Sequence, residues 1–561
     1  MLSRIFTLFL FFTLLLSWIL PVHNRPWSNV YHELMAGLSL LFAVLAVASI
    51  KNRIYLPFSA VLVAAVAVIP LTQVFFGVIV FNSDAILSVI YIFVFSVSIF
   101  ASFNLQRFSF GFSGGSFVGS FSWVLVTAVL ISIFFMLHQW FRLEQSQWIL
   151  TLNPGVRPSA NIAQPNNLVT LLGMGLAAVF YLYEKKMLGR FAASLLTVFI
   201  LFGVALTQSR TPWVVSLVLV FIWAIKQDVV GLRVRLVHVL LWIMVYAAMV
   251  LFLPFLADYL YLSAASPIDR AMQLHRLDLY MQFVLAIFKG PWYGHGWGQV
   301  FTAQYKIAAE SQSYISAMYT HNVLLDILIW NGPVLGVLII GVLVFWFLRL
   351  LVMARSNEAL FAWVGLSFFV VHSMLEYPHA YTFLLIPAGF FVGILLEGMD
   401  SSKWVARLPW WSAFSVIVPG FFVVYILWTD YLVVEKNYHA AIAAFGDEDN
   451  SRYAQSLPKA YIFDGMQSYV DLMIMPVRSG YSSDEIDGVL KTAERYPIFF
   501  MLLRSAELLA VNGEVDKALE KLNAIKYLHT AEQLDFTLNY LSDKTEEHPE
   551  YVVLIERLNM Q

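Results

Sequence analysis

The chain has 561 residues, of which 60% are hydrophobic and only 12% are charged. A soluble globular protein carries about twice that charged fraction, so the composition excludes a soluble protein and predicts that lipid surrounds most of the chain. The net charge of -2 provides no basic excess to neutralise a nucleic-acid backbone, which excludes nucleic-acid partners. Because the chain contains no cysteine, a disulfide framework, a thiolate metal site and a cysteine nucleophile are excluded as well.

Apolar stretches predict about thirteen transmembrane helices, and hence an all-α polytopic membrane protein. Each stretch has close to the roughly 20 residues that cross a bilayer. They lie near residues 5–21, 32–50, 55–72, 85–104, 117–137, 166–183, 191–206, 212–225, 236–257, 333–352, 359–376, 381–396 and 412–429. Three of them, 191–206, 212–225 and 381–396, are short, and a short span is tolerated where it lines a cavity walled by protein.

The loops between these stretches predict that the N-terminus lies inside. With that orientation every inside loop carries at least one lysine or arginine, as the positive-inside rule requires. The outside loops at 73–84 and 373–380 carry neither. The first stretch resembles a signal sequence, but LPVHN after it lacks a small-x-small cleavage pattern, so we expect a retained anchor. Thirteen spans then place the C-terminus outside.

The composition changes from apolar to charged at about Tyr431. We therefore expect two domains. Residues 1–430 form the membrane core, with a long outer loop at about 258–321, and residues 431–561 form a soluble helical domain outside the membrane. The segment SAELLAVNGEVDKALEKLNAI, with Asn-Gly between two amphipathic stretches, resembles a tetratricopeptide unit, although no clean period of about 34 residues is present.

Two arginines stand on the outer side, where basic residues run against the positive-inside rule. Arg210 lies in the turn TQSRTPW between two spans, and Arg276 lies in the long outer loop. A guanidinium offers paired donors that match phosphate oxygens, so the two could clamp a phosphate or a diphosphate. The alternatives are that Arg210 reaches lipid headgroups and that Arg276 pairs with Asp278 or Asp269 on a solvated loop.

His321 and Asn322 open an apolar helix after the glycine-rich and aromatic segment PWYGHGWG. A histidine at this position can accept a proton from a hydroxyl near neutral pH, which general-base activation of an alcohol requires. The alternative is a hydrogen-bonded cap at the membrane interface.

Amide and acidic side chains flank two other spans. Gln164 and Asn166 precede one span, and Glu376 and Tyr377 follow another. Amides suit the recognition of sugar hydroxyls or phosphate oxygens, but Asn166 equally fits a helix cap. Burial would raise the pKa of Glu376; alternatively, this carboxylate is a structural partner for a buried donor.

The sequence contains no P-loop and no histidine-rich metal spacing. We therefore expect neither a metal nor a nucleotide. Long apolar helices beside a cationic outer site suit a lipid-linked anionic substrate instead.

The order of these motifs resembles that of the bacterial O-antigen ligase and polymerase (Wzy_C) superfamily. SRT lies between two spans, Arg276 is followed four residues on by Tyr280, PWYGHGWG comes next, and HN opens a helix followed by NGPVLG. NIAQPNNLVTLLGMGLA and HSMLEYPHAYTFLLIPAG resemble the protein-glycosylation branch, the PglL-type O-oligosaccharyltransferases. The resemblance covers the chain from about residue 155 to 400.

The resemblance implies a GT-C-like ligase fold in the bacterial inner membrane, with the active site and the C-terminal domain in the periplasm. Such enzymes move a glycan from undecaprenyl diphosphate to a hydroxyl, without a metal or other cofactor. Carried over by position, Arg210 and Arg276 hold the diphosphate, with Arg270 beside Asp269 as an alternative ligand, and His321 activates or positions the acceptor hydroxyl. The remaining candidates for substrate binding are Gln164, Asn166, Asn322, Glu376 and Tyr377.

The implied acceptor is a hydroxyl of a protein such as a pilin. The C-terminal helical domain lies outside the part of the chain that carries the resemblance, and from its position outside the membrane alone we expect it to dock this acceptor. An O-antigen ligase that uses the lipid A core and a Wzy-type polymerase share the fold and remain alternatives. A transporter of lipid-linked glycans would carry internal repeats and charges at the midplane of the membrane, whereas the candidate residues lie at the outer face.

Overall fold

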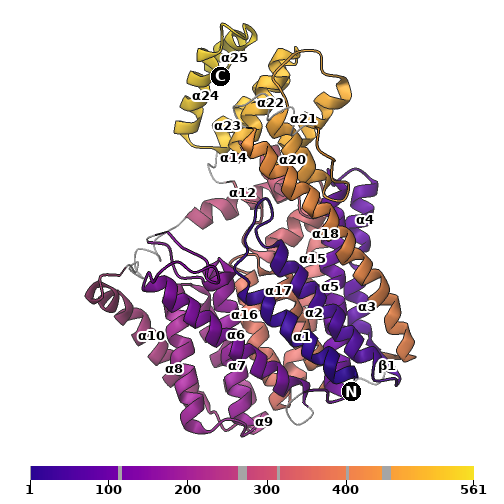
Figure 1. Cartoon of the computed structure of the whole chain (residues 1–561), viewed down its shortest axis with the longest axis vertical. Coiled ribbons are helices and arrows are strands. Elements are labelled where there is room, and N and C mark those ends of the chain that lie inside the picture. Colours follow the sequence, from indigo (N-terminus) through magenta and orange to yellow (C-terminus); the bar gives the residue numbers. More distant parts are fainter. Residues whose placement is uncertain are drawn as a thin grey trace. The chain divides into compact units, whose positions relative to one another are not determined.

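The computed structural model describes residues 2–111, 116–153, 155–262, 275–311, 316–399, 404–444 and 456–560, with the backbone alone at residues 275 and 276. Within these ranges the predicted all-α fold is confirmed (Figure 1). Two short strands, β1 (Ile54–Pro57) and β2 (Val405–Leu408), pair antiparallel.

A helix is present at every one of the predicted spans. Eleven helices in the described ranges have the length and hydropathy needed to cross a membrane, which confirms a polytopic membrane protein. The count of about thirteen is not confirmed, because α16 (Asn357–Ser373) and α17 (Thr382–Glu397) have only 17 and 16 residues. The other helices at the predicted spans are α1 (Leu2–Ile19), α2 (Val30–Ala48), α3 (Phe58–Ala65) with α4 (Val68–Phe75), α5 (Asn82–Arg107), α6 (Phe117–Trp140), α7 (Pro165–Glu184), α8 (Arg190–Thr207), α9 (Thr211–Val230), α10 (Leu236–Tyr259), α15 (Val323–Met353) and α18 (Phe414–Ala443).

The chain forms two compact units. Unit 1 contains Met1–Ala67, Ile90–Gln273 and Leu343–Tyr425, and unit 2 contains Val68–Val89, Leu274–Val342 and Ile426–Gln561. The long helices α5, α15 and α18 each contribute residues to both units. In particular, α18 continues without a break through Tyr431, so the division at residue 431 remains a prediction.

Unit 1 is a bundle packed around α7, which is the most buried of the eleven candidate spans. Neighbouring helices α6, α8 and α16 contact it along its length. The approach of α16 depends on Gly173, since a Cβ there would lie 2.2 Å from the ring of Phe368. At one end of the bundle, the Trp18 indole donates a hydrogen bond of 2.8 Å to the carbonyl of Phe383. This packing fixes the ends of α7 and α16, which carry several of the candidate residues.

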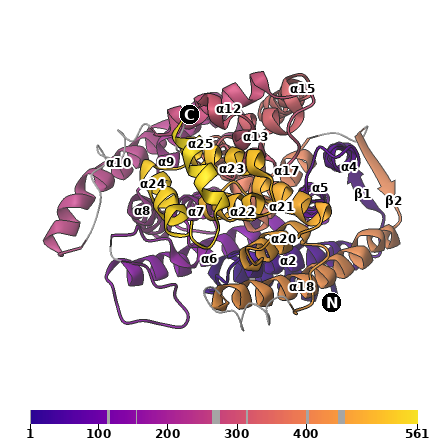
Figure 2. The same ribbon diagram turned by 90° about the horizontal axis from the view of Figure 1, so that it is seen from above.

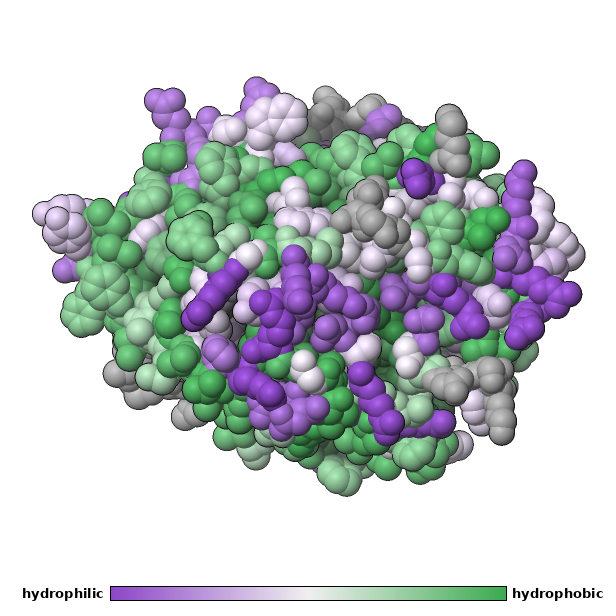
Figure 3. Space-filling view, turned by 90° about the horizontal axis from the view of Figure 1, so that it is seen from below, coloured by the Kyte–Doolittle hydropathy of each residue, from purple (hydrophilic) through white to green (hydrophobic). Residues whose placement is uncertain are grey.

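The opposite end of unit 1 is basic. Lys185 pairs with Glu358 at 2.5 Å, and the Lys226 ammonium donates to the carbonyl of Val352 at 2.8 Å. The strands β1 and β2 lie at this end, where Arg107 stacks over Tyr55. Figure 3 shows hydrophilic side chains gathered between hydrophobic ones on the face seen from below. The positive-inside rule places the loops that carry Lys185, Lys226 and Arg107 in the cytoplasm, and that orientation remains a prediction.

Unit 2 combines short helices of the long outer loop with a C-terminal helical array. The loop helices are α12 (His275–Lys289), α13 (Val300–Lys306) and α14 (Ala308–Ser311). The array consists of α20 (Asp464–Ile474), α21 (Ser483–Arg495), α22 (Phe499–Val511), α23 (Val515–Leu528), α24 (Ala531–Asp543) and α25 (Glu550–Asn559). Neighbours α21, α22 and α23 lie side by side (Figure 2), and Asn512-Gly513 forms the turn between α22 and α23.

Candidate functional site

The N-terminus of α7 shows how the amides of unit 1 are used. Gln164 is the N-cap, because its side-chain oxygen accepts a hydrogen bond from the Asn167 amide at 2.5 Å. The interpretation of Asn166 as the cap is therefore wrong. Asn166 instead donates from Nδ2 to Oε1 of Glu376 at 3.1 Å. Two candidate residues that are 210 positions apart in the sequence are thus in direct contact.

The C-terminal end of α16 completes this group. His372 is fully buried, and its Nδ1 lies 2.7 Å from the Thr170 hydroxyl on α7. The amide of Glu376 donates to the carbonyl of His372 at 2.7 Å. We call Asn166, Thr170, His372 and Glu376 the α7–α16 polar cluster. Glu376 is 7% exposed and is a partner for the Asn166 side chain, although this donor is only half-buried.

Tyr377 follows the cluster directly. Its ring stacks on that of Tyr381, with 5.9 Å between the ring centroids. Burial raises the pKa of the Tyr377 hydroxyl, and the neighbouring charge of Glu376 raises it further. The hydroxyl is therefore protonated near neutral pH and can donate a hydrogen bond to an oxygen of a substrate.

Arg210 lies on the surface of unit 1, at the N-terminus of α9. The chain reaches it through Gln208, which adopts a left-handed conformation with φ of 49°. A second guanidinium, that of Arg157, donates to the carbonyl of Thr207 at 3.1 Å, three residues before Arg210. Helix N-termini attract anions, so the turn offers a cation and a helix end to a phosphate. Arg157 was not among the predicted site residues, although a basic residue in an outside loop is a usable signal.

In unit 2, His321 occupies a strained turn just before α15. Its φ is +59°, in the left-handed region that few residues other than glycine adopt. The amide of Thr320 donates to the buried carboxylate of Asp326 at 2.9 Å, and the Thr320 hydroxyl donates to the carbonyl of Asn322 at 2.7 Å. The side chain of Asn322 accepts from the Leu324 amide at 3.0 Å, so this candidate caps the helix. These bonds hold the His321 backbone in one conformation.

The helix α12 is attached to the same turn. The Tyr280 hydroxyl donates to the carbonyl of His321 at 3.3 Å. Arg276 lies four residues before Tyr280 on α12, which places both residues on one face of the helix. Arg270 and Asp269 lie outside the described residues. Within unit 2, the structure therefore brings the helix of Arg276 to the turn of His321, while Arg210 belongs to unit 1.

The segment PWYGHGWG packs against α15, the helix that follows this turn. The amides of His295 and Gly296 donate to the carbonyls of Ile329 and Trp330 on α15. Trp297 stacks on Trp330 with 4.9 Å between ring centroids. This close approach requires the kink of α15 at Gly332, whose φ is +74° and where a Cβ would lie 2.0 Å from a backbone oxygen. PWYGHGWG is thus a tight aromatic turn held against α15.

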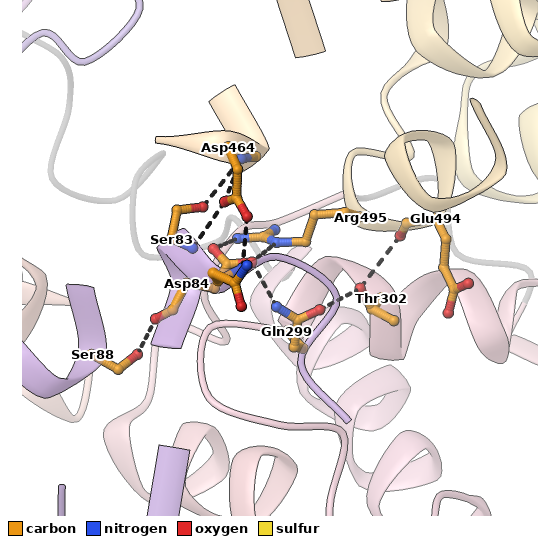
Figure 4. Close-up of polar contacts among 10 residues, drawn as sticks. Ser83, Asp84, Ser88, Gln299, Thr302, Asp464, Glu494 and Arg495 are labelled. Carbon is orange, nitrogen blue, oxygen red and sulfur yellow. Dashed lines mark hydrogen bonds and ion pairs between the residues drawn. The ribbon is translucent and has the colours of Figure 1, made fainter. Parts of the chain in front are cut away.

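A buried ion pair joins three distant segments of unit 2 (Figure 4). Arg495 of α21 donates from Nε and Nη2 to the two carboxylate oxygens of Asp84 at 2.7 and 2.8 Å. Gln299, at the start of α13, donates to the same carboxylate at 2.8 Å. Burial alone would lower the pKa of Arg495, but the charge of Asp84 raises it above its ordinary value. We call these three residues the Asp84 clasp.

Comparison with known proteins assigns the chain to a family. Two family models match: O-antigen ligase over residues 195–340, and virulence factor membrane-bound polymerase, C-terminal, over residues 360–539. A general O-oligosaccharyltransferase from Acinetobacter baylyi is 30% identical over 554 residues, covering 94% of this chain and 92% of the relative. A ComP-specific O-oligosaccharyltransferase from the same organism is 28% identical over 489 residues, covering 86% and 87%.

The chain belongs to the O-oligosaccharyltransferase family. This confirms the resemblance seen in the motif order, and it makes the protein a glycosyltransferase of the multi-pass membrane type. Membership also supports O-linked protein glycosylation as its general function, since both relatives carry that activity in their names. O-oligosaccharyltransferases in general join a lipid-linked glycan donor to a protein acceptor.

Proposed function

We propose that this O-oligosaccharyltransferase moves a whole glycan from undecaprenyl diphosphate to a serine or threonine hydroxyl of an acceptor protein such as a pilin. The hydroxyl attacks the anomeric carbon, the bond to the diphosphate breaks, and the configuration of the sugar inverts. The hydroxyl proton passes to a base, and the diphosphate leaves on its lipid carrier. No metal takes part, because guanidinium groups neutralise the charge of the leaving group.

The conformation of His321 is the observation that carries this proposal. A left-handed residue costs on the order of 1 kcal/mol or more, and such strain persists where the surroundings determine it. Here Asp326, Asn322 and Tyr280 fix the backbone on both sides of the residue. An imidazole titrates near neutral pH and can take the hydroxyl proton. We therefore assign the role of general base to His321.

The diphosphate is assigned to the arginines. Arg210 stands at a helix N-terminus, and Arg276 stands on the helix that Tyr280 ties to the turn of His321. Each guanidinium can bind two phosphate oxygens at once. Arg270 is the alternative ligand in the same segment of sequence.

The remaining candidates are assigned to the glycan and the acceptor. Asn166, Glu376 and Tyr377 present amide, carboxylate and phenol groups at one end of unit 1 and suit sugar hydroxyls. Gln164 and Asn322 use their side-chain oxygens as helix caps. We therefore assign only their side-chain NH2 groups to substrate binding. In this proposal the enzyme lies in the inner membrane, with these groups and the C-terminal helices in the periplasm.

Glycan transfer in a bacterium that lacks its own ligases tests the proposal. The cell supplies an undecaprenyl-linked glycan and either a pilin or ComP as acceptor, and mass spectrometry measures the acceptor. We expect no acceptor with added glycan mass in Arg210→Ala. In His321→Ala the rate at which glycosylated acceptor forms should fall at least about 100-fold, the usual contribution of a general base. The control His439→Ala changes an exposed histidine of α18 and should transfer normally.

Other outcomes would replace parts of the proposal. Full transfer by His321→Ala, with normal folding and donor binding, would remove this residue from catalysis. Modification of lipid A core, or lengthening of the carrier-linked glycan, would make the protein a ligase or a polymerase instead. Loss of transfer in EDTA that returns with a divalent cation would contradict metal independence.

A further inference from the structure

The C-terminal helical array of unit 2 contains a large groove that the proposed transfer reaction does not use. Its volume is about 1250 Å³, and residues of α20, α21, α22 and α24 line it. Cavities for small molecules have about 300–1,000 Å³, so this groove has room for a peptide segment. Its apolar lining includes Met473, Met475, Phe499, Phe500, Phe536 and Tyr540. We call it the C-terminal groove.

Part of this apolar lining is open to solvent. Phe536 is 54% exposed, and its ring stacks on that of Tyr540 with 6.0 Å between centroids. The same ring contacts Phe499 at 5.9 Å. Phe536 thus forms the exposed edge of an aromatic cluster whose other two rings are half-buried, and apolar surface of this kind at a groove marks a site that binds another molecule.

The floor of the groove carries more positive than negative charge. Glu507 is 2% exposed and accepts a hydrogen bond from the Tyr540 hydroxyl at 2.9 Å. Two cations flank this carboxylate, Arg504 at 3.5 Å and Lys544 at 3.8 Å. Burial alone would lower the pKa of Lys544, but its hydrogen bond with Tyr540 and the charge of Glu507 raise it, so the ammonium stays charged. One carboxylate therefore faces two positive groups.

The other two acids of the groove already accept hydrogen bonds within the array. Asp471 is bound by Lys459 at 2.7 Å, and Glu485 accepts from the amide and the hydroxyl of Ser482 at 2.8 Å each. On the same wall Arg478 is exposed and lies over an aromatic ring. Four cations and three acids line the groove, which leaves an excess of one positive charge; they are Lys459, Arg478, Arg504 and Lys544, and Asp471, Glu485 and Glu507.

We propose that the C-terminal groove binds a segment of the acceptor protein that carries apolar side chains and an acidic side chain. The aromatic side chains around Phe536 take the apolar residues, and the carboxylate lies beside Lys544 and Arg478. This inference rests on the proposed function, since it supplies the protein partner of the same reaction. In this role the groove raises the affinity for the acceptor and leaves the chemical step unchanged.

Steady-state kinetics of the purified full-length enzyme in nanodiscs test this inference, with the pilin or ComP probe that wild type glycosylates. We expect Phe536→Ala, Lys544→Gln and Arg478→Glu each to raise the acceptor KM about five- to tenfold, as for loss of one anchor or one charge pair at an interface. The donor KM and kcat should stay within about twofold. Two controls outside the groove, Tyr461→Ala and Lys491→Glu, change an exposed aromatic and an exposed cation and should leave all constants unchanged.

A charge exchange separates binding from misfolding. Each acidic residue of the acceptor is changed to lysine in turn, and one such acceptor should be bound better by Arg478→Glu than by wild type. An unchanged acceptor KM in all three groove variants would show that the groove does not bind the acceptor, and it would leave the proposed function intact. A rise in the donor KM instead would assign the groove to the lipid-linked glycan. If wild type glycosylates neither probe protein but extends a carrier-linked glycan, the proposed function itself fails.

Discussion

The α7–α16 polar cluster of unit 1 and the Asp84 clasp of unit 2 hold their surroundings in different ways. The cluster lies at the ends of two helices that pack along their length, and its hydrogen bonds add to contacts such as that of Gly173 with Phe368. The clasp joins α5, α13 and α21 through a charged pair whose side chains are 6% and 12% exposed. Hydrophobic packing therefore positions the first group, whereas an ion pair links the segments of the second.

Breaking the clasp should have the largest effect on stability. Arg495→Ala leaves the buried carboxylate of Asp84 with Gln299 as its donor, and loss of one partner of a buried pair costs about 3 kcal/mol or more. Thermal unfolding of the full-length protein in detergent measures the loss. The control Lys491→Ala breaks the exposed pair with Asp487, which should cost less than about 1 kcal/mol.

A double variant sharpens this test. Asp84→Ala with Arg495→Ala removes both charges, so it should be less destabilised than the sum of the two single variants. Equal and small losses in all three variants would show that packing, rather than the ion pair, links these segments. The two units would then be held by packing alike, and the contrast between packing in unit 1 and an ion pair in unit 2 would be wrong.

Substitutions in the α7–α16 polar cluster should affect glycan transfer more than the stability of the fold. Because packing already fixes both helices, Asn166→Ala should cost only about 1 kcal/mol of stability. If the cluster binds substrate, the same change should lower kcat/KM about tenfold or more, measured with the transfer assay. The control Ser367→Ala removes a buried hydroxyl that bonds within α16, so it should affect stability alone. Equal transfer by both variants would make the cluster purely structural.

The sequence allowed the helices of unit 1 and part of this cluster to be predicted. Apolar stretches of bilayer length gave the spans, because each helix satisfies its own backbone groups in lipid. For Glu376, one of the two hypotheses was a structural partner for a buried donor; its partner is Asn166, which is half-buried. The interpretation of Asn166 as the N-cap of α7 was wrong because Gln164, two residues earlier, takes that position ahead of Pro165.

The links within unit 2 could not be predicted from the sequence. Asp84 and Arg495 are 411 residues apart, and nothing in either local sequence marks a partner. The same holds for Tyr280, whose spacing to Arg276 was noted for its likeness to a family but did not indicate its hydrogen bond to His321. The motif NGPVLG was noted for its likeness to a family, and its physical reason is the kink at Gly332. Local patterns thus indicated the helices and a set of candidate residues, while long-range contacts determine how these residues are held.

The capping box at the start of α21 in unit 2 should give the smallest effect. It tests whether a local sequence pattern stabilises a helix of this unit. Ser482 and Glu485 form a capping box at the start of α21, each side chain bonding the other residue's backbone amide. Ser482→Ala should speed hydrogen exchange of the first amides of α21 about fivefold at pH 7, the usual effect of losing a cap. Thr530→Ala is the matched control, because its capping box uses Gln533, which does not titrate.

The pH dependence separates these two caps. Hydrogen bonds from the Ser482 amide and hydroxyl hold the pKa of Glu485 below its ordinary value of 4.5. A carboxyl with a depressed folded pKa stabilises the fold above its unfolded pKa, and the benefit is lost as the pH falls through the folded value. The ratio of the amide exchange rates of Ser482→Ala and wild type should therefore be largest at pH 7 and shrink as the pH falls below 4.5. The same ratio for Thr530→Ala should stay constant. A constant difference at Ser482 would show that the hydroxyl, and not the carboxylate, caps α21.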